Sequence, residues 1–249
     1  MKIVIPSYER YETIQQKSIN LLLSYGYEPN DIYVFVANED QYNKYKEKIE
    51  KDISIIIAVK GLKEVREFIF NYFDEGEHLL CLDDDIEAVR ELYKNDDNKS
   101  RLRPVENLKQ IVDKGFELCE QHSLKLWGLY PTPNNAFFME SQKEITYDYK
   151  FIIGNFFGCI NCKDMNKLNV LDMDDYERSI RSYLLYGGSV RMNHIAPKTK
   201  FKKNTGGAQD DDRENRLSQS REILMTTYPD LLFMRKRKND INPVLKDKR

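Results

Sequence analysis

The sequence predicts an α/β fold in which a mainly parallel sheet carries helices on its faces. Short apolar segments alternate with amphipathic helical segments through the N-terminal part of the chain, which is the pattern of such folds. The chain has 249 residues, of which 41% are hydrophobic, enough for one sizeable core. We therefore expect a single domain.

The N-terminal part contains four segments typical of buried strands and three typical of helices. The strands are expected at residues 2–5, 32–37, 53–58 and 79–82. The helices are expected at residues 14–25, ending at Gly26, and at residues 40–50 and 61–74.

The C-terminal part adds strands and helices in a less regular order. Residues 95–103 are strongly charged and are expected to form a mobile loop over a crevice. Strands are expected at 126–130, 136–140, 151–161 and 189–195, and helices at 108–119, 172–187 and 210–225. The single tryptophan, Trp127, is expected in the core rather than against a substrate.

Three adjacent carboxylates, Asp83, Asp84 and Asp85, follow the strand-like segment 79–82. Such a cluster is tolerable in open water or around a cation, because desolvated carboxylates repel one another. Strand alternation would point Asp83 and Asp85 to one side and Asp84 to the other, an arrangement that suits Mg or Mn. A solvated loop or a helix N-terminus is the alternative explanation.

The loop Pro6–Arg10 follows the first expected strand. In parallel sheets ligands bind beyond the carboxyl ends of the strands, so this loop and the acidic triplet should face one crevice. Arg10 and Arg66 are then candidate partners for a diphosphate, with ordinary surface salt bridges as the alternative.

A second acidic group, Asp172, Asp174 and Asp175, opens the helix expected at 172–187. Helix capping explains some of these carboxylates, with Asp172 as the N-cap. Because one cap does not require three Asp residues, one of them is a candidate general base.

Basic residues gather near the C-terminus although the formal net charge is −2. Lysines surround Phe201 and precede Gly206 and Gly207, a composition that suits either a loop closing on phosphates or a solvated edge strand. The lysines in question are Lys198, Lys200, Lys202 and Lys203. Residues 235–249 read as a basic tail, either contacting phosphates or unstructured.

The remaining features favour an ordinary cytoplasmic protein. Cys159 and Cys162 form a CxxC motif without a second ligand pair, so reduced thiols are expected rather than a zinc or redox site. No signal peptide and no apolar run of membrane-spanning length is apparent, and no obligate protein partner is evident.

Several motifs in order resemble known enzymes. The N-terminal ones resemble glycosyltransferases of the GT-A fold, and they are Ile5-Pro6-Ser7-Tyr8-x-Arg10, Gly61-Leu62 to Arg66, and Leu82-Asp83-Asp84-Asp85. Later motifs resemble the TET/JBP-associated glycosyltransferases of bacteriophages and other microbes. They are Trp127-Gly128-Leu129-Tyr130-Pro131 with Asn135, Phe151-Ile152-Ile153-Gly154 with Gly158, Asp174-Asp175-Tyr176-Glu177-Arg178, and Lys198-Thr199-Lys200 leading to Gly206-Gly207.

This resemblance implies a GT-A-like, Rossmann-type mixed sheet flanked by helices, with a nucleotide-sugar-binding half at about 1–93 and an acceptor-side half at about 104–230. The implied reaction moves a sugar from a nucleotide-sugar donor, expected to be a UDP-hexose, to a hydroxymethylated pyrimidine in DNA. The acceptor would be 5-hydroxymethylcytosine or 5-hydroxymethyluracil, extruded from the duplex. Inversion at the anomeric carbon is expected if the base lies opposite the leaving group.

The resemblance also assigns roles by position. Asp83 and Asp85 would bind Mn or Mg, completed by His194, and Asp84 would contact the ribose or sugar. The residues that would hold the donor are Pro6, Ser7, Tyr8, Arg10, Arg66, Gly206 and Gly207. Asp175, or its neighbour Asp174, would accept the proton of the acceptor hydroxyl. The nucleic-acid contacts would come from Lys198, Lys200, Lys202, Lys203, Arg235, Lys236 and Arg237.

Three alternatives remain open from the sequence. The chain could be a GT-A enzyme that acts on a glycan or protein, or a metal-dependent nucleotidyltransferase that releases pyrophosphate. It could also be a non-catalytic module that recognises modified DNA.

Overall fold

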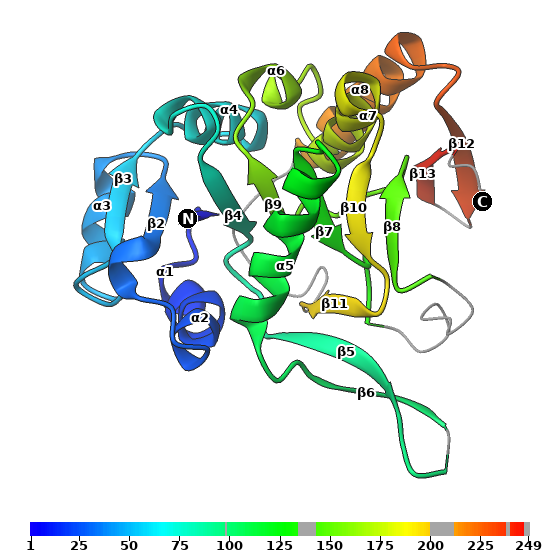
Figure 1. The fold of residues 1–249 in the computed structure, drawn as a ribbon. Coiled ribbons are helices and arrows are strands. Elements are labelled where there is room, and N and C mark those ends of the chain that lie inside the picture. Colours follow the sequence, from blue (N-terminus) through cyan, green and yellow to red (C-terminus); the bar gives the residue numbers. More distant parts are fainter. Residues whose placement is uncertain (98, 134–142, 200–211, 238–239, 247–249) are drawn as a thin grey trace.

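The computed structural model describes residues 1–97, 99–133, 143–199, 212–237 and 240–246. Its centre is an eight-stranded mixed sheet in the order β3-β2-β1-β4-β9-β7-β10-β8 (Figure 1). The N-terminal four strands are β1 (Lys2–Pro6), β2 (Ile32–Val36), β3 (Ser54–Ile57) and β4 (His78–Leu82). They pair in parallel, as the sequence predicts.

Side chains of these strands alternate between two hydrophobic clusters, one on each face of the sheet. Ile3 and Ile5 of β1 belong to one cluster, and Val4 between them belongs to the other. Helix α4 (Leu62–Tyr72) covers the second face because Val65 and Ile69 lie on one side of the helix. Helices α1 (Tyr11–Ile14) and α2 (Asn20–Ser24), joined by the π-helical turn η1 (Gln15–Ile19), pack on the first face.

The remaining N-terminal elements are α3 (Glu39–Lys46) and the 3₁₀ turn η2 (Pro29–Asp31).

The C-terminal half continues the same sheet. Strand β9 (Phe156–Ile160) runs antiparallel between β4 and β7 (Leu126–Leu129), and β10 (Ser189–Met192) runs parallel to β7. Strand β8 (Ile145–Asp148) forms the edge, antiparallel to β10. The helices of this half are α5 (Leu108–Gln121), α6 (Lys163–Asn166), α7 (Asp174–Tyr186) and α8 (Arg213–Thr227).

Two expectations about irregular segments are wrong. Residues 100–103 of the segment expected as a loop belong instead to β6 (Ser100–Pro104), which forms a hairpin with β5 (Ala88–Lys94). The hairpin projects from the body, and β5 also pairs with β11 (Ile195–Lys198) (Figure 1). Cross-strand pairs stabilise it, among them the 2.6 Å bond from Arg103 to Glu91. The segment expected as a basic tail instead contributes to a second hairpin, β12 (Leu232–Arg237) with β13 (Asp240–Leu245).

The outcomes of the expectations about other strands, the cysteines and membrane-spanning segments are as follows. The strand expected at 189–195 ends at Met192, so that His194 lies in a turn, and β8 was not expected at all. The strand expected at 136–140 lies outside the described residues. All four cysteines are free and buried. Among the helices of the described part, none has the length and apolar character needed to cross a membrane.

Trp127 is fully buried, as expected, between α5 and β9. Gly158 and Gly115 leave the space for its indole, because a Cβ at Gly158 would lie 1.9 Å from the indole Nε1 and one at Gly115 would lie 2.4 Å from Cδ2. Close contact between β9 and α5 therefore depends on these two glycines.

We predict that Gly158→Ala lowers the free energy of unfolding by about 3 kcal/mol, because the added methyl overlaps the indole. Urea denaturation measures this. Gly76→Ala is the control: its φ of +89° disfavours alanine but no atom lies within 4 Å, so about 1 kcal/mol is expected. In a Trp127→Leu background the cost of Gly158→Ala should shrink, and an unchanged cost would contradict the overlap.

Candidate active site

The acidic triplet lies in a turn immediately after β4. The backbone N–H of Asp83 donates to the carbonyl of Asn155 at 3.0 Å, and Ser18 Oγ donates to the carbonyl of Asp83 at 2.7 Å. Because the strand ends at Leu82, strand alternation does not set the side-chain directions. Asp83 instead faces Arg66, whereas Asp84 and Asp85 both face Arg10.

Asp84 lies beneath the loop that follows β1 and is only 4% exposed. Its carboxylate accepts hydrogen bonds from Ser7 Oγ at 2.5 Å and from Arg10 Nη1 at 2.7 Å. Tyr45 completes the arrangement by sharing a 2.6 Å hydrogen bond with Ser7 and accepting one from the Arg10 amide. Burial raises the pKa of Asp84, and Arg10 opposes this shift. Both carboxylate oxygens thus hold the loop, rather than facing a ribose as the sequence suggests.

Arg66 joins the triplet to the second acidic group. It is 2% exposed, and its Nη2 lies 3.1 Å from Asp83 Oδ1 while its Nε lies 3.6 Å from Asp174 Oδ2. Nη2 also donates to the carbonyl of Gly154 at 3.2 Å. One guanidinium on α4 therefore sets the spacing between the end of β4 and the start of α7.

Asp174 is an anchor within this network. Arg178, one helical turn further on, donates to it at 2.7 Å, and the Arg178 guanidinium lies 4.5 Å from the centre of the Phe157 ring. Although burial favours the neutral acid, Arg178 and Arg66 hold the pKa of Asp174 below its ordinary value.

Asp175 is the less restrained neighbour. Its carboxylate accepts hydrogen bonds from the backbone amides of Tyr176 at 3.0 Å and Gly154 at 3.4 Å. Burial, together with the charge of Asp174, raises the pKa of Asp175 to about 7. A carboxyl group that ionises near neutral pH suits a general base.

Asp172 is held elsewhere. It pairs with Arg216 of α8 at 3.0 Å and is buried, so it does not cap α7 as expected. Met173 occupies the N-cap position without a side-chain cap. Of the three aspartates, Asp172 and Asp174 are thus paired with arginines, which leaves Asp175 for chemistry.

Asp83 and Asp85 could hold a divalent cation. Removal from water raises the pKa of Asp83 to about 7, and Asp85 and Asp84 add to the shift, although 41% of the Asp83 side chain stays exposed. Their oxygen donors fit Mg or Mn, although each carboxylate already has an arginine partner, with Arg66 3.1 Å from Asp83 and Arg10 3.5 Å from Asp85. Within the described residues no three His, Cys, Asp or Glu side chains converge as a metal site, so substrate phosphates and water would complete the coordination.

His194 is not near this centre. It lies in the turn between β10 and β11, where its carbonyl accepts from Leu92 at 2.8 Å. Leu92 is four residues beyond Ala88, at the start of β5, a distance of roughly 13 Å along an extended strand. The structure thus separates His194 from Asp83 and Asp85.

The donor-side loop also presents an aromatic ring. Pro6 ends β1, and the half-buried ring of Tyr8 lies 5.0 Å from the Lys60 ammonium, which follows β3. Tyr8 and Lys60 therefore meet beyond the carboxyl ends of β1 and β3, the two strands that flank β2.

The expected nucleic-acid contacts are scattered. Lys198 pairs with Glu87 at 3.7 Å, close to the triplet, whereas Arg235 lies over the Phe233 ring on β12 with Lys236 exposed beside it. The backbone of Arg237 ends β12. Lys200, Lys202, Lys203, Gly206 and Gly207 lie outside the described residues.

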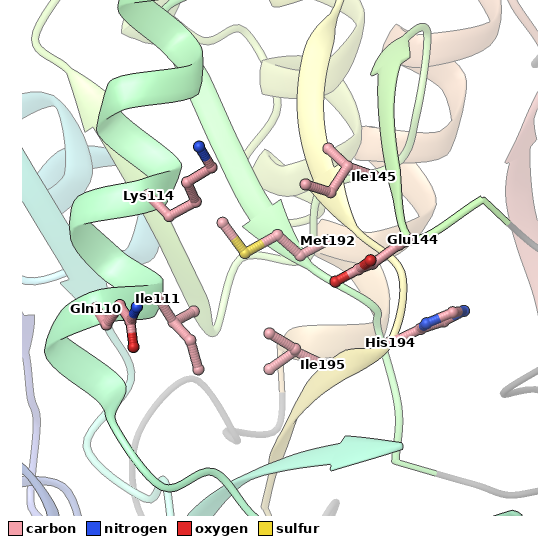
Figure 2. A pocket seen from close by; sticks show the side chains of 8 residues that line it. All are labelled: Gln110, Ile111, Lys114, Glu144, Ile145, Met192, His194 and Ile195. Carbon is pink, nitrogen blue, oxygen red and sulfur yellow. The ribbon is translucent and has the colours of Figure 1, made fainter. Parts of the chain in front are cut away.

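A separate cavity of about 230 Å³ lies against α5. Figure 2 shows Ile111, Ile145, Met192 and Ile195 around it, with Glu144 at its side. The three isoleucines pack against the hydrophobic cluster on the α5 face of the sheet. Arg66, in contrast, lies over Phe157 on the other face. This cavity is therefore distinct from the acidic centre.

Comparison with known proteins identifies the class of fold. No protein-family model and no curated protein sequence matches the chain. The fold is similar to that of the mannosyltransferase PcManGT from Pyrobaculum calidifontis, solved in complex with GDP-Man and Mn²⁺, with a TM-score of 0.54 and 10% identity over 82% of this chain. This match confirms the expected GT-A-like mixed sheet flanked by helices.

S. aureus TarS 1-349 also matches, with a TM-score of 0.47 and 14% identity over 79% of this chain. A longer S. aureus TarS structure has a TM-score of 0.46 and 12% identity over 91% of this chain. The chain spans 57% of the mannosyltransferase and 59% and 44% of the two TarS chains.

Sequence reasoning missed Arg178 as a functional residue. Its position four residues after Asp174 was the available signal, because such residues face each other on a helix. Its Nε also donates to Asn166 at 3.2 Å, which links α6 to the network.

We predict that Arg178→Met lowers the free energy of unfolding by about 3–5 kcal/mol, because it leaves the buried Asp174 charge with Arg66 alone. Adding Asp174→Asn should recover part of this loss. Lys44→Ala, which breaks an exposed pair with Asp40, should cost about 0.5 kcal/mol or less. Equal costs for Arg178→Met and Lys44→Ala in urea denaturation would contradict the buried network.

Proposed function

We propose that this chain is a metal-dependent glycosyltransferase that moves a sugar from a nucleotide-sugar donor to an acceptor hydroxyl. The observation that carries the proposal is the Arg66 bridge, since it brings Asp83, a candidate metal ligand, and Asp174, the residue next to the candidate base, to the same end of the sheet. The fold shared with a mannosyltransferase that was solved with GDP-Man and Mn²⁺ supports it.

The donor occupies the side of the triplet. Asp83 and Asp85 hold Mn or Mg, which when bound neutralises charge on the leaving diphosphate. Arg10, positioned by Asp84, faces the diphosphate, and the Tyr8 ring offers a surface for the nucleotide base. We also propose that Gly206 and Gly207 contribute to donor binding, as the motif resemblance implies.

The acceptor occupies the side of α7. Asp175 accepts the proton of the attacking hydroxyl, and the oxygen attacks the anomeric carbon as the bond to the diphosphate breaks. Because Asp172 and Asp174 are paired with arginines, we propose Asp175 as the base for one displacement with inversion. Asp174 holds Arg66 and is not the base.

For the acceptor we propose a 5-hydroxymethylpyrimidine in DNA. The motif resemblance supports this choice, and Arg235 and Lys236 offer exposed or half-buried cations for phosphates. A glycan acceptor is the second candidate, because the mannosyltransferase likeness supports it equally. The same likeness admits a GDP-sugar as donor beside the expected UDP-hexose.

We predict that kcat/KM rises with pH and levels off above about pH 7, because Asp175 must be ionised to act as a base. Below the pKa the rate should fall about tenfold per pH unit. Asp175→Asn should lower the rate by about 100-fold or more and flatten the profile. Asp40→Asn on exposed α3 is the control, and an unchanged profile in Asp175→Asn would exclude this base.

We also predict that Mn²⁺ with the correct nucleoside diphosphate raises Tm by about 5–10 °C at a hundredfold excess over Kd. Asp83→Asn with Asp85→Asn should abolish the part of the shift that requires Mn²⁺. Transfer is then assayed with hydroxymethylated DNA, unmodified DNA and a glycan. Transfer to the glycan alone would exclude the DNA acceptor, and pyrophosphate release from a nucleoside triphosphate would indicate a nucleotidyltransferase.

A further inference from the structure

The segment just before α7 is strained and has no cap of its own. Met173 has a φ of +66° and a ψ of 31°, a left-handed conformation that is unfavourable for a residue with a side chain. No side chain caps α7 at this position. Such a conformation persists when the surroundings hold it in place.

Helix α8 supplies these surroundings. Arg216 Nε lies 3.0 Å from Asp172 Oδ2, and the fully buried Ser220 Oγ accepts the amides of Leu171 and Asp172 at 3.2 and 3.0 Å. Arg216 and Ser220 are one helical turn apart, so both face the same segment. The two residues preceding Met173 are therefore fixed from outside α7.

A second contact holds the same segment from the other side. The fully buried carboxylate of Glu177 accepts the amides of Asn169 at 2.7 Å and Val170 at 3.0 Å. Tyr228, the residue after α8, donates to Glu177 at 2.9 Å. Both ends of α8 are thus connected to the first turns of α7.

We propose that Arg216 and Asp172 are a positioning pair for the transfer reaction. By holding residues 169–173 in their turn, α8 fixes the direction in which the Asp175 carboxylate points. This inference rests on the proposed role of Asp175 as the base. Since the hydrogen bonds to Asp83 and Asp84 come from Ser7, Arg10 and Arg66 rather than from α8, the pair acts on the acceptor step and not on donor binding.

The test compares Arg216→Ala, the isosteric Asp172→Asn and the conservative Arg216→Lys with the wild-type chain. The control is Arg221→Ala, an arginine of the same helix that pairs with Glu214, which is also on α8. Three quantities are measured: Tm, steady-state kcat and donor KM, and hydrogen exchange of the amides of residues 169–177.

We expect Arg216→Ala and Asp172→Asn to lower kcat about 10- to 100-fold with donor KM changed less than about twofold. Exchange at 169–177 should accelerate, Arg216→Lys should recover part of kcat, and Arg221→Ala should match wild type. Faster exchange with unchanged kcat, or a loss confined to donor KM, would overturn the positioning role. If hydrogen exchange at 169–177 is unchanged in these variants while the wild-type chain is active, then Arg216 and Asp172 do not hold this segment.

Failure of the proposed function would give a different experimental result from failure of the positioning pair. A wild-type chain that transfers no sugar from any donor removes the base whose direction is at issue and overturns both proposals. A wild-type chain that is active while the variants keep its kcat overturns the positioning pair alone.

Discussion

The site depends on one buried guanidinium between two carboxylates from distant parts of the chain. Asp83 follows β4 and Asp174 begins α7. Without Arg66 between them, their two carboxylates would repel each other. Within the described residues, Nε and Nη1 of Arg66 are buried without a hydrogen-bond acceptor, so its electrostatic pairing with these acids is what offsets its burial. Because α4 packs on the sheet, Arg66 on this helix holds both carboxylates in place relative to the sheet.

The arginines also divide the aspartates by role. Asp174, which is paired with the buried guanidiniums of Arg178 and Arg66, has a lowered pKa and stays ionised, so it is a poor proton acceptor. Burial and the charge of Asp174 raise the pKa of the adjacent Asp175, whose hydrogen bonds come from backbone amides. The same pairing that secures α7 therefore also acts on the pKa of the candidate base.

The sequence predicts the N-terminal half of the fold well because β1 to β4 are buried strands whose apolar runs are unambiguous. It also predicts that the acidic triplet follows a strand and that Arg10 and Arg66 lie near the triplet. It fails where pairing with other parts of the chain decides. Charged residues 100–103 form a strand through their partners on β5, and Asp172 does not cap α7 because Arg216 of α8 pairs with it. No local pattern specifies such partners.

Gly154 shows why the two halves of the site cannot move independently. Its carbonyl accepts from Arg66 and its amide donates to Asp175, so a single residue contacts both the bridge and the candidate base. A Cβ here would lie 3.3 Å from the Cβ of Asp175, closer than ordinary contact allows. Its φ is not positive, so the constraint at this position is the close approach of Asp175. A side chain here would require the start of α7 to shift by a few tenths of an ångström, and this turn carries both Asp174, the partner of Arg66, and Asp175, the candidate base.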